Sequence, residues 1–163
     1  MPELPDVDVY AACLSREVTG ETLERVRLAS PFLLRSVDPP VAEAVGRKVA
    51  TVARLGKRIV IGLDNDVHLV LHLMIAGRLV WGERGLKVPK RIGLAAFDFS
   101  SGSLLLREAG SKKRASLHLA RGAEGLAEFD RGGLEVIDAS LTDFTTALTR
   151  ENHTLKRSLT DPR

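Results

Sequence analysis

The first residues of the chain, MPELPD, place a proline directly behind the initiator methionine. Once Met1 is removed, Pro2 carries a free secondary amine, which can attack an electrophilic carbon and form an iminium. An amide nitrogen has its lone pair tied up in resonance, so this chemistry requires the loss of Met1. Glu3 is next to the amine and could pass a proton to a leaving group or a sugar oxygen. The alternative is that Pro2 only protects a terminus and that the nearby acidic residues only begin a helix.

An amphipathic helix is predicted to position this amine. From Pro5 to about Thr19, apolar residues recur at helical spacing, with Asp6 in the first turn and Gly20 just past the end. Pro5 suits the first helical position because its missing N–H would be unpaired there in any case. Pro2 would then lie just before the helix, where the positive end of the helix dipole disfavours the protonated amine.

Short β-rich runs follow the helix. About eight of them alternate with turns such as 55–56 and 101–102, which are so short that antiparallel hairpins are the expected connections. The predicted strands are Leu23–Ala29, Val49–Leu55, Arg58–Leu63, His68–Leu73, Gly77–Trp81, Ile92–Phe99, Ser103–Arg107 and Ala115–Ala120. We therefore expect a mainly β (α+β) fold, an antiparallel β-sandwich of roughly eight strands with an N-terminal α-helix. Residues 41–45 are predicted to form a short helical turn and residues 82–90 a mobile loop.

A linker that contains several glycines, residues 122–133, is predicted to separate this sandwich from a helical segment. Ser140 or Thr142 could cap a helix that runs through Leu148. A second helical start near residue 152 is cut off by the closing residues 161–163. We therefore expect one domain over residues 1–133 and the start of an incomplete helical domain over residues 134–163, and we infer that the sequence is an N-terminal fragment of a longer protein.

The composition excludes several classes of protein. With 163 residues, 44% hydrophobic and 28% charged, it is typical of a soluble globular chain and has no apolar run that could span a membrane. The single cysteine, Cys13, rules out an internal disulfide, and the four histidines lack paired ligand spacing, so no metal or other cofactor is expected here. The start lacks the features of a signal peptide, so a cytoplasmic protein is expected. The formal charge of +3 favours nucleic acid only weakly.

Four stretches of the sequence carry a resemblance to a known family. Residues 2–8, PELPDVD, closely resemble the PELPEVE start of the formamidopyrimidine-DNA glycosylase and endonuclease VIII family. Residues 55–58, LGKR, are similar to a turn of that family that carries a basic residue, and residues 72–77, HLMIAG, to its HLGMSG stretch. Residues 155–161, LKRSLTD, resemble the entry to its helix-two-turn-helix domain. These stretches follow the family's order from one end of the chain to the other.

The resemblance implies the N-terminal catalytic domain of a bifunctional DNA glycosylase/AP lyase, an enzyme of base excision repair. Pro2 would attack the anomeric carbon of an oxidised nucleotide turned out of the duplex, forming a Schiff base before elimination breaks the strand. Glu3 would be the proton shuttle, and Lys57 would hold the phosphate next to the lesion and stabilise charge during elimination. Asp6 would organise the helix start rather than perform chemistry.

The implied partner is double-stranded DNA that contains damaged bases or abasic sites, bound by a monomer at the bacterial nucleoid. His72 and Lys156 would contact the DNA backbone; otherwise they are a half-buried strand histidine and a plain surface lysine. Ile75 stands where the family has a wedge methionine, and Lys112 and Arg114 lie in the region of its arginine and phenylalanine wedges. No phenylalanine occurs in that region, so the family's lesion range and opposite-base preference do not carry over.

The resemblance also implies that the family's C-terminal DNA-gripping segments lie beyond this sequence, including any zinc finger. These residues alone are therefore expected to bind duplex weakly and to be inactive or weakly active. The alternative function is a non-catalytic β-sandwich that binds damaged DNA through its basic rim. A structural sandwich without a DNA role is the third possibility.

Overall fold

The computed structural model describes residues 2–160. The predictions about Met1 and about the closing residues 161–163 therefore lie outside the described residues. The chain divides into two compact units, of which the first ends at Leu126 and the second begins at Ala127. The expected domains, 1–133 and 134–163, remain a prediction.

The first unit is built from one long helix and eight strands. The helix α1 (Leu4–Val18) comes first, a single 3-10 turn (Val41–Ala44) follows β1, and the short helix α2 (Gly122–Ala127) follows β8. The strands are β1 (Thr22–Leu28), β2 (Arg47–Leu55), β3 (Arg58–Leu63), β4 (Val67–His72), β5 (Gly77–Gly82), β6 (Gly93–Phe99), β7 (Ser103–Glu108) and β8 (Ser116–Arg121).

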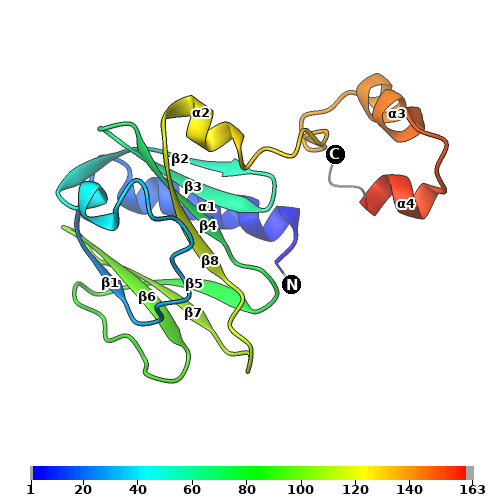
Figure 1. The fold of residues 1–163 in the computed structure, drawn as a ribbon. Coiled ribbons are helices and arrows are strands. Elements are labelled where there is room, and N and C mark those ends of the chain that lie inside the picture. The colour runs from blue at the N-terminus through cyan, green and yellow to red at the C-terminus, as the bar shows by residue number, and fades with distance from the viewer. Residues whose placement is uncertain (1, 161–163) are drawn as a thin grey trace. The chain divides into compact units, whose positions relative to one another are not determined.

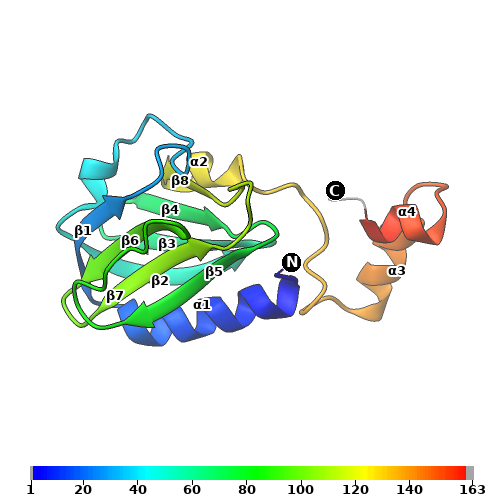
Figure 2. The same cartoon turned by 90° about the horizontal axis from the view of Figure 1, so that it is seen from below.

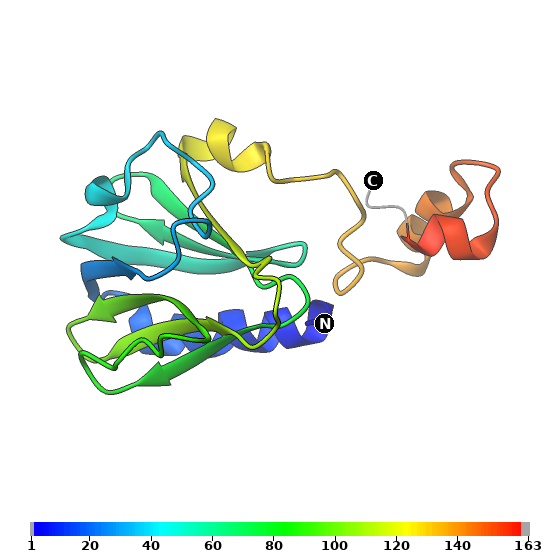
Figure 3. The same cartoon turned by 60° about the horizontal axis from the view of Figure 1, so that its bottom comes forward.

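These strands confirm the predicted antiparallel β-sandwich. They form one eight-stranded sheet in the order β5-β7-β6-β1-β2-β3-β4-β8. The sheet is folded into two layers (Figures 1 and 3), which are joined where Thr22 and Leu23 of β1 pair with Lys48 and Arg47 of β2. The predicted strand positions agree with the observed ones to within two residues at each end, because period-2 alternation and turn residues mark both the strands and their limits.

The core lies between the two layers. Alternate residues of β3, namely Ile59, Ile61 and Leu63, face it, as do the corresponding residues of the neighbouring strands. The helix α1 adds a buried stripe of Val7, Ala11, Leu14 and Val18 at helical spacing and packs against β2 and β3 along the side of the sandwich (Figure 2). The position of α1 is therefore fixed by the core, and its first residue is held at one end of the sandwich.

The loop predicted to be mobile, residues 82–90, is anchored at two points. Arg27 donates hydrogen bonds to both carboxylate oxygens of Asp98, each at 2.7 Å, and to the carbonyl oxygen of Leu86 at 2.8 Å. The hydroxyl of Ser103 donates to Asp98 at 2.6 Å and accepts from the backbone N–H of Gly85 at 2.9 Å. Irregular backbone in this loop is thus tied to two strands through a polar network that the sequence alone did not indicate.

This network predicts an acid-sensitive contribution to stability. Burial disfavours the Asp98 carboxylate, but hydrogen bonds from Arg27 and Ser103 and the charge of Arg27 outweigh burial, so the pKa of Asp98 lies below its ordinary value of 3.8. A carboxylate with a depressed pKa stabilises the fold above its unfolded pKa, and that contribution disappears as the pH falls through the folded pKa. Arg27→Leu should therefore lower the free energy of unfolding by about 2–3 kcal/mol at neutral pH. Urea unfolding should show this difference shrinking below pH 3.8; a difference that grows toward acid pH would contradict the assignment.

The second unit contains two short helices, α3 (Leu141–Thr149) and α4 (Leu155–Thr160). Ser140 caps α3, accepting a hydrogen bond from the backbone N–H of Asp143 at 3.1 Å, which selects Ser140 over the alternative Thr142. The predicted linker at 122–133 is partly wrong, because its first residues form α2. None of the helices in the described residues is long and apolar enough to cross a membrane.

Candidate functional site

The residues that begin α1 form the first part of the site. Pro2 is buried and lies two residues before the first helical residue, Leu4. Pro5 therefore occupies the second helical position rather than the predicted first one. Glu3 is the N-cap residue, and its backbone N–H donates to the carboxylate of Asp6 at 2.8 Å. Glu3 and Asp6 thus form a capping box that fixes the helix start.

Lys57 reaches this helix start from a distant part of the sequence. It follows Gly56 in the turn between β2 and β3, where Gly56 has a φ of 54°, a conformation that favours glycine. The Lys57 ammonium forms an ion pair with the carboxylate of Glu3. A second ion pair, between Arg54 of β2 and Asp8 at 3.2 Å, joins the strand before this turn to α1. The structure therefore brings Lys57 to Glu3, the residue that follows the predicted nucleophile.

The Glu3–Lys57 pair is suited to exchange partners. The two side chains are 52% and 41% exposed, respectively. Exposed ion pairs of this kind contribute at most about 1 kcal/mol to stability, so a phosphate could take the ammonium at little cost to the fold. Glu3 would then lose its counter-ion as Lys57 gains a new one.

Strand register gathers two further loops beside the β2–β3 turn at this same end of the sandwich. Arg58, the residue after Lys57, pairs with His72 on β4, and His72 pairs with Ser116 on β8. Gly77 at the start of β5 pairs with Glu108 at the end of β7. The β2–β3 turn, residues 73–76 and residues 109–115 are therefore neighbours, and Figure 2 shows these connections at the end where the chain begins.

His72 has a defined orientation. Its Nδ1 accepts a hydrogen bond from the backbone N–H of Met74 at 3.0 Å. An accepting Nδ1 carries a lone pair, so the neutral imidazole holds its proton on Nε2. The Nε2–H group is then a donor of the kind that suits a phosphate oxygen.

Ile75 lies in a tight turn between β4 and β5. Met74 has a φ of 52°, and the N–H of Gly77 donates to the carbonyl oxygen of Leu73 at 2.9 Å. A Cβ on Gly77 would lie 2.3 Å from that same oxygen, so only glycine fits. Ile75 is 50% exposed at the turn, where an apolar side chain is available to a partner molecule.

Lys112 and Arg114 are both exposed on the loop between β7 and β8. Glu108, at the end of β7, is buried beside them and was not predicted from the sequence. A signal was present, because Leu104, Leu106 and Glu108 alternate on one strand and therefore share its core face. An acidic side chain at a core-facing position needs a hydrogen-bonding partner inside the protein, because burying it without one is costly.

Two arginines, Arg58 and Arg35, act electrostatically on His118 of β8. On β8, burial lowers the pKa of His118, and the charges of Arg58 and Arg35 lower it further. Both guanidinium groups must therefore lie close enough to His118 to raise the local positive potential. Such a potential favours a polyanion near the end of the sandwich.

Lys156 belongs to the second unit. It is exposed in the first turn of α4, where Thr154 accepts a hydrogen bond from the N–H of Arg157 at 3.4 Å. The role of Lys156 as a phosphate contact remains a prediction.

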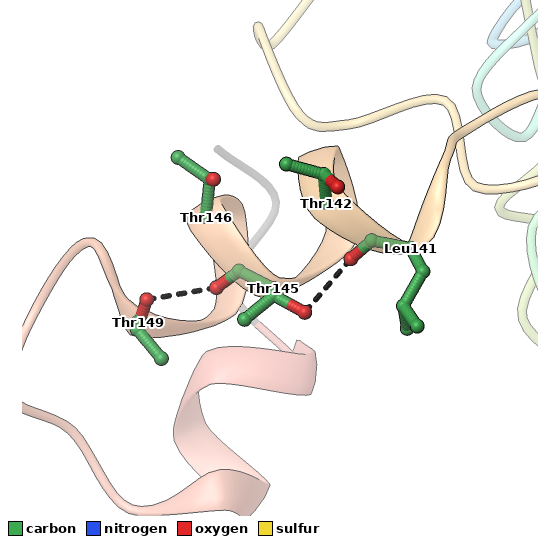
Figure 4. Close-up of a pocket in the computed structure, with 5 residues that line it drawn as sticks. All are labelled: Leu141, Thr142, Thr145, Thr146 and Thr149. Atoms are coloured by element: carbon green, nitrogen blue, oxygen red, sulfur yellow. Dashed lines mark hydrogen bonds between the residues drawn. The ribbon is translucent and has the colours of Figure 1, made fainter.

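A surface pocket on α3 is lined by Leu141, Thr142, Thr145, Thr146 and Thr149 (Figure 4). The hydroxyl of Thr145 donates to the carbonyl oxygen of Leu141 at 2.7 Å, and that of Thr149 donates to Thr145 at 2.8 Å. These hydroxyls satisfy the backbone of their own helix, and the pocket includes none of the predicted site residues. Within residues 2–160, no group of three or more histidine, cysteine or acidic side chains could hold a metal ion.

Comparisons with known proteins agree with the resemblance seen in the sequence. Residues 1–122 match the family model described as the formamidopyrimidine-DNA glycosylase N-terminal domain. The formamidopyrimidine-DNA glycosylase of Heliobacterium modesticaldum is 32% identical over 170 aligned positions, which cover 99% of this chain and 61% of that protein. The enzyme of Acidothermus cellulolyticus is 27% identical over 168 positions, which cover 99% of this chain and 59% of that protein.

Solved structures show the same fold. The Lactococcus lactis formamidopyrimidine-DNA glycosylase, non-covalently bound to DNA containing an AP site, aligns with a TM-score of 0.71 at 19% identity, covering 78% of this chain and 48% of that one. Another structure of the Lactococcus lactis protein, in complex with DNA containing an oxidised pyrimidine, aligns with a TM-score of 0.70. The chain spans between about two-fifths and three-fifths of the length of the first relatives it matches.

Proposed function

The chain belongs to the formamidopyrimidine-DNA glycosylase family, and we propose that it is the N-terminal catalytic domain of a bifunctional DNA glycosylase/AP lyase that excises oxidised bases. The observation that carries this proposal is the convergence at the start of α1, where Pro2 precedes Glu3 and Glu3 is paired with Lys57 across 54 residues of sequence. An amine, a proton donor and a phosphate-binding cation are the three groups that this chemistry needs.

The proposed reaction begins when the Pro2 nitrogen, freed by loss of Met1, attacks C1′ of the damaged nucleotide. The bond from C1′ to the base breaks, and its electron pair leaves with the base. The nitrogen, which is cationic after the attack, gives its proton to the Glu3 carboxylate and recovers its lone pair. That lone pair then forms the C=N bond as the bond from C1′ to O4′ opens, and O4′ takes the proton from Glu3. The resulting iminium is an electron sink, so a C2′ proton becomes acidic and the 3′ phosphate is eliminated.

Lys57 is proposed to couple DNA binding to this sequence of steps. In the structure its ammonium neutralises Glu3. A backbone phosphate arriving beside Pro2 would compete for the same ammonium, because it belongs to a polyanion whose many phosphates together attract a cation more strongly than one exposed carboxylate does. Release of Glu3 would leave it next to the sugar as the proton shuttle.

The proposed partner is double-stranded DNA with damaged bases or abasic sites, bound by a monomer in the bacterial cytoplasm. The exposed Lys112 and Arg114 and the half-exposed Ile75 belong to loops at the end that carries Pro2. His72, with its Nε2 donor, is the last residue of β4 at the same end. Cations suit the phosphates, and an apolar side chain suits the gap left by an extruded base. The solved structures of the Lactococcus lactis protein with AP-site DNA support this assignment.

The proposal is tested by borohydride trapping. The complete protein, mixed with a duplex that contains one abasic site and reduced with borohydride, should become covalently linked to DNA. Strand cleavage without any trapped species would contradict an iminium mechanism.

Replacing Lys57 by alanine should weaken DNA binding and slow elimination. Loss of one phosphate contact should reduce the slope of log K against log salt by about 0.9. Strand cleavage should fall roughly tenfold to a hundredfold. Binding measured by fluorescence anisotropy and cleavage measured on gels would report both effects.

Lys48→Ala is a matched control, because Lys48 is a lysine on the surface of β2 that pairs with Thr22, away from the turn that carries Lys57. It should leave the salt dependence and cleavage near wild-type values. Equal losses in the two variants would show that general charge, rather than the position of Lys57, is responsible.

One observation favours a second candidate function, a non-catalytic module that binds damaged DNA. Residues 109–115 contain no phenylalanine, and Ile75 replaces a wedge methionine. This candidate predicts salt-sensitive binding of abasic duplex, with neither trapping nor cleavage by the complete, processed protein.

A further inference from the structure

Glu108 is a buried carboxylate that the proposed chemistry does not use. It is the last residue of β7 and is 1% exposed. A buried ionised side chain is costly unless strong hydrogen bonds satisfy it. Its partners therefore indicate what the residue does for the fold.

Those partners are backbone groups at the far end of the next loop. One carboxylate oxygen of Glu108, Oε2, accepts hydrogen bonds from the N–H of Arg114 at 2.8 Å and from the N–H of Ala115 at 3.1 Å. The side chain at the start of the loop thus binds the backbone at its end. Charge-assisted bonds to two backbone donors fix a loop more firmly than neutral ones would.

Lys113 closes the same loop from the opposite direction. Its ammonium donates to the carbonyl oxygen of Glu108 and to that of Gly110, the latter at 3.0 Å. Lys113 is half-buried in this role, whereas its neighbours Lys112 and Arg114 are exposed. The hydrogen bonds of Glu108 and Lys113 together form a clamp on residues 109–115. This clamp uses one of the three consecutive basic residues, Lys113, and leaves the side chains of Lys112 and Arg114 exposed.

The clamped loop also lies against the turn that carries Ile75. Glu108 pairs with Gly77 across the strands, and a Cβ built on Gly110 would lie 3.8 Å from the Cβ of Ala76. A loop held in this way places Lys112 and Arg114 beside the turn without using their side chains for the fold.

We propose that Glu108 is a positioning residue, which holds residues 109–115 as a preformed platform so that Lys112 and Arg114 meet the DNA backbone beside Ile75. This inference rests on the proposed function, since it names the part of the fold that prepares the DNA-binding loop. Preorganisation lowers the entropy cost of binding. Loss of the preformed loop should therefore weaken DNA affinity more than it slows the catalytic steps.

The test compares Glu108→Ala with Glu108→Gln in the complete protein, using a duplex that carries a stable abasic-site analogue. The amide oxygen of glutamine can accept both N–H groups that now meet Oε2, whereas alanine accepts neither. Glu108→Ala should weaken binding about tenfold and reduce the slope of log K against log salt by up to about 1.8, the value for two phosphate contacts. Glu108→Gln should restore most of the affinity and most of the salt slope. Borohydride trapping, measured separately on a saturating duplex with a natural abasic site, should change little in either variant.

Two controls separate positioning from general destabilisation. Ser36→Ala also removes a side-chain acceptor from a backbone N–H, that of Leu119 at 2.7 Å, but outside the loop, and should leave the salt slope unchanged. Replacing Lys112 and Arg114 by alanine should reduce the slope in the wild-type background and have little further effect in the Glu108→Ala background. If Glu108→Ala does not fold, Lys113→Met removes the other half of the clamp and should reduce the slope in the same way.

An unchanged salt slope in folded Glu108→Ala or Lys113→Met would overturn the inference, as would fully additive effects of the loop substitutions. Failure of the proposed function looks different. In that case the wild-type protein itself would not be trapped on abasic DNA, whatever the behaviour of the Glu108 variants.

Discussion

Replacing Pro2 by glycine should reduce borohydride trapping on abasic DNA by roughly a hundredfold or more. Glycine offers a primary amine, which lacks the fixed ring geometry of proline. Because Pro2 lies before α1 and outside its hydrogen-bonded turns, the substitution should leave the fold intact. Circular dichroism and thermal unfolding would verify that point, and denaturing gels would measure the fraction of DNA trapped against time.

A removable N-terminal extension supplies the matched control for this prediction. A protein that begins with the extension has its Pro2 nitrogen in an amide and should not trap DNA. Protease cleavage directly before Pro2 should restore trapping in the same sample. Persistent trapping by both the blocked protein and Pro2→Gly would show that a lysine or another amine is the nucleophile.

Replacing Glu3 by glutamine should slow base excision by about 10²–10⁴-fold. Glutamine keeps the size of the side chain but cannot donate the proton that O4′ or the departing base requires. The helix start should survive, because the backbone N–H of residue 3 still donates to Asp6 and the amide oxygen of glutamine can still accept from the backbone N–H of Asp6 in the capping box. Single-turnover excision of an oxidised base would measure the effect, and cleavage at a preformed abasic site should fall less.

Asp6→Asn is the control for this second prediction. It alters the carboxylate that accepts the Glu3 N–H at 2.8 Å but leaves the proposed proton shuttle in place. A small loss of thermal stability with excision within a few-fold of wild type is expected. Equal losses in Glu3→Gln and Asp6→Asn would point to the geometry of the helix start, and unchanged excision in Glu3→Gln would remove Glu3 from the mechanism.

The fold could be predicted from local patterns because those patterns are strong in this chain. The buried stripe of α1 repeats at helical spacing, and turns such as the one at Gly56 separate strands with clear alternation. The prediction failed where local signals were ambiguous. Glycines at 122 and 125 indicated a linker, yet residues 122–127 form α2. Helix α2 is short and follows β8 directly, so no long periodic pattern marks it.

The candidate site was less accessible to prediction from residues alone. Glu3 and Lys57 are 54 positions apart, and nothing in their spacing shows that they meet; the family resemblance suggested a shared site, and the structure pairs the two side chains. The anchoring of loop 82–90 by Arg27 also depends on contacts between distant strands. Such contacts follow from register, which becomes known only once the sheet order is known. The clamp at Glu108 is local, but it depends on the conformation of a loop that has no regular pattern in the sequence.

The identity of the residue that becomes bonded to deoxyribose is the most direct test of the central claim. Complete, processed protein would be trapped on abasic DNA with borohydride, digested with nuclease and protease, and analysed by mass spectrometry for the peptide that carries the sugar remnant. We predict a single modified peptide that begins at Pro2, with the added mass on its terminal nitrogen. A remnant on a lysine peptide, or a modified peptide that still carries Met1, would contradict the account.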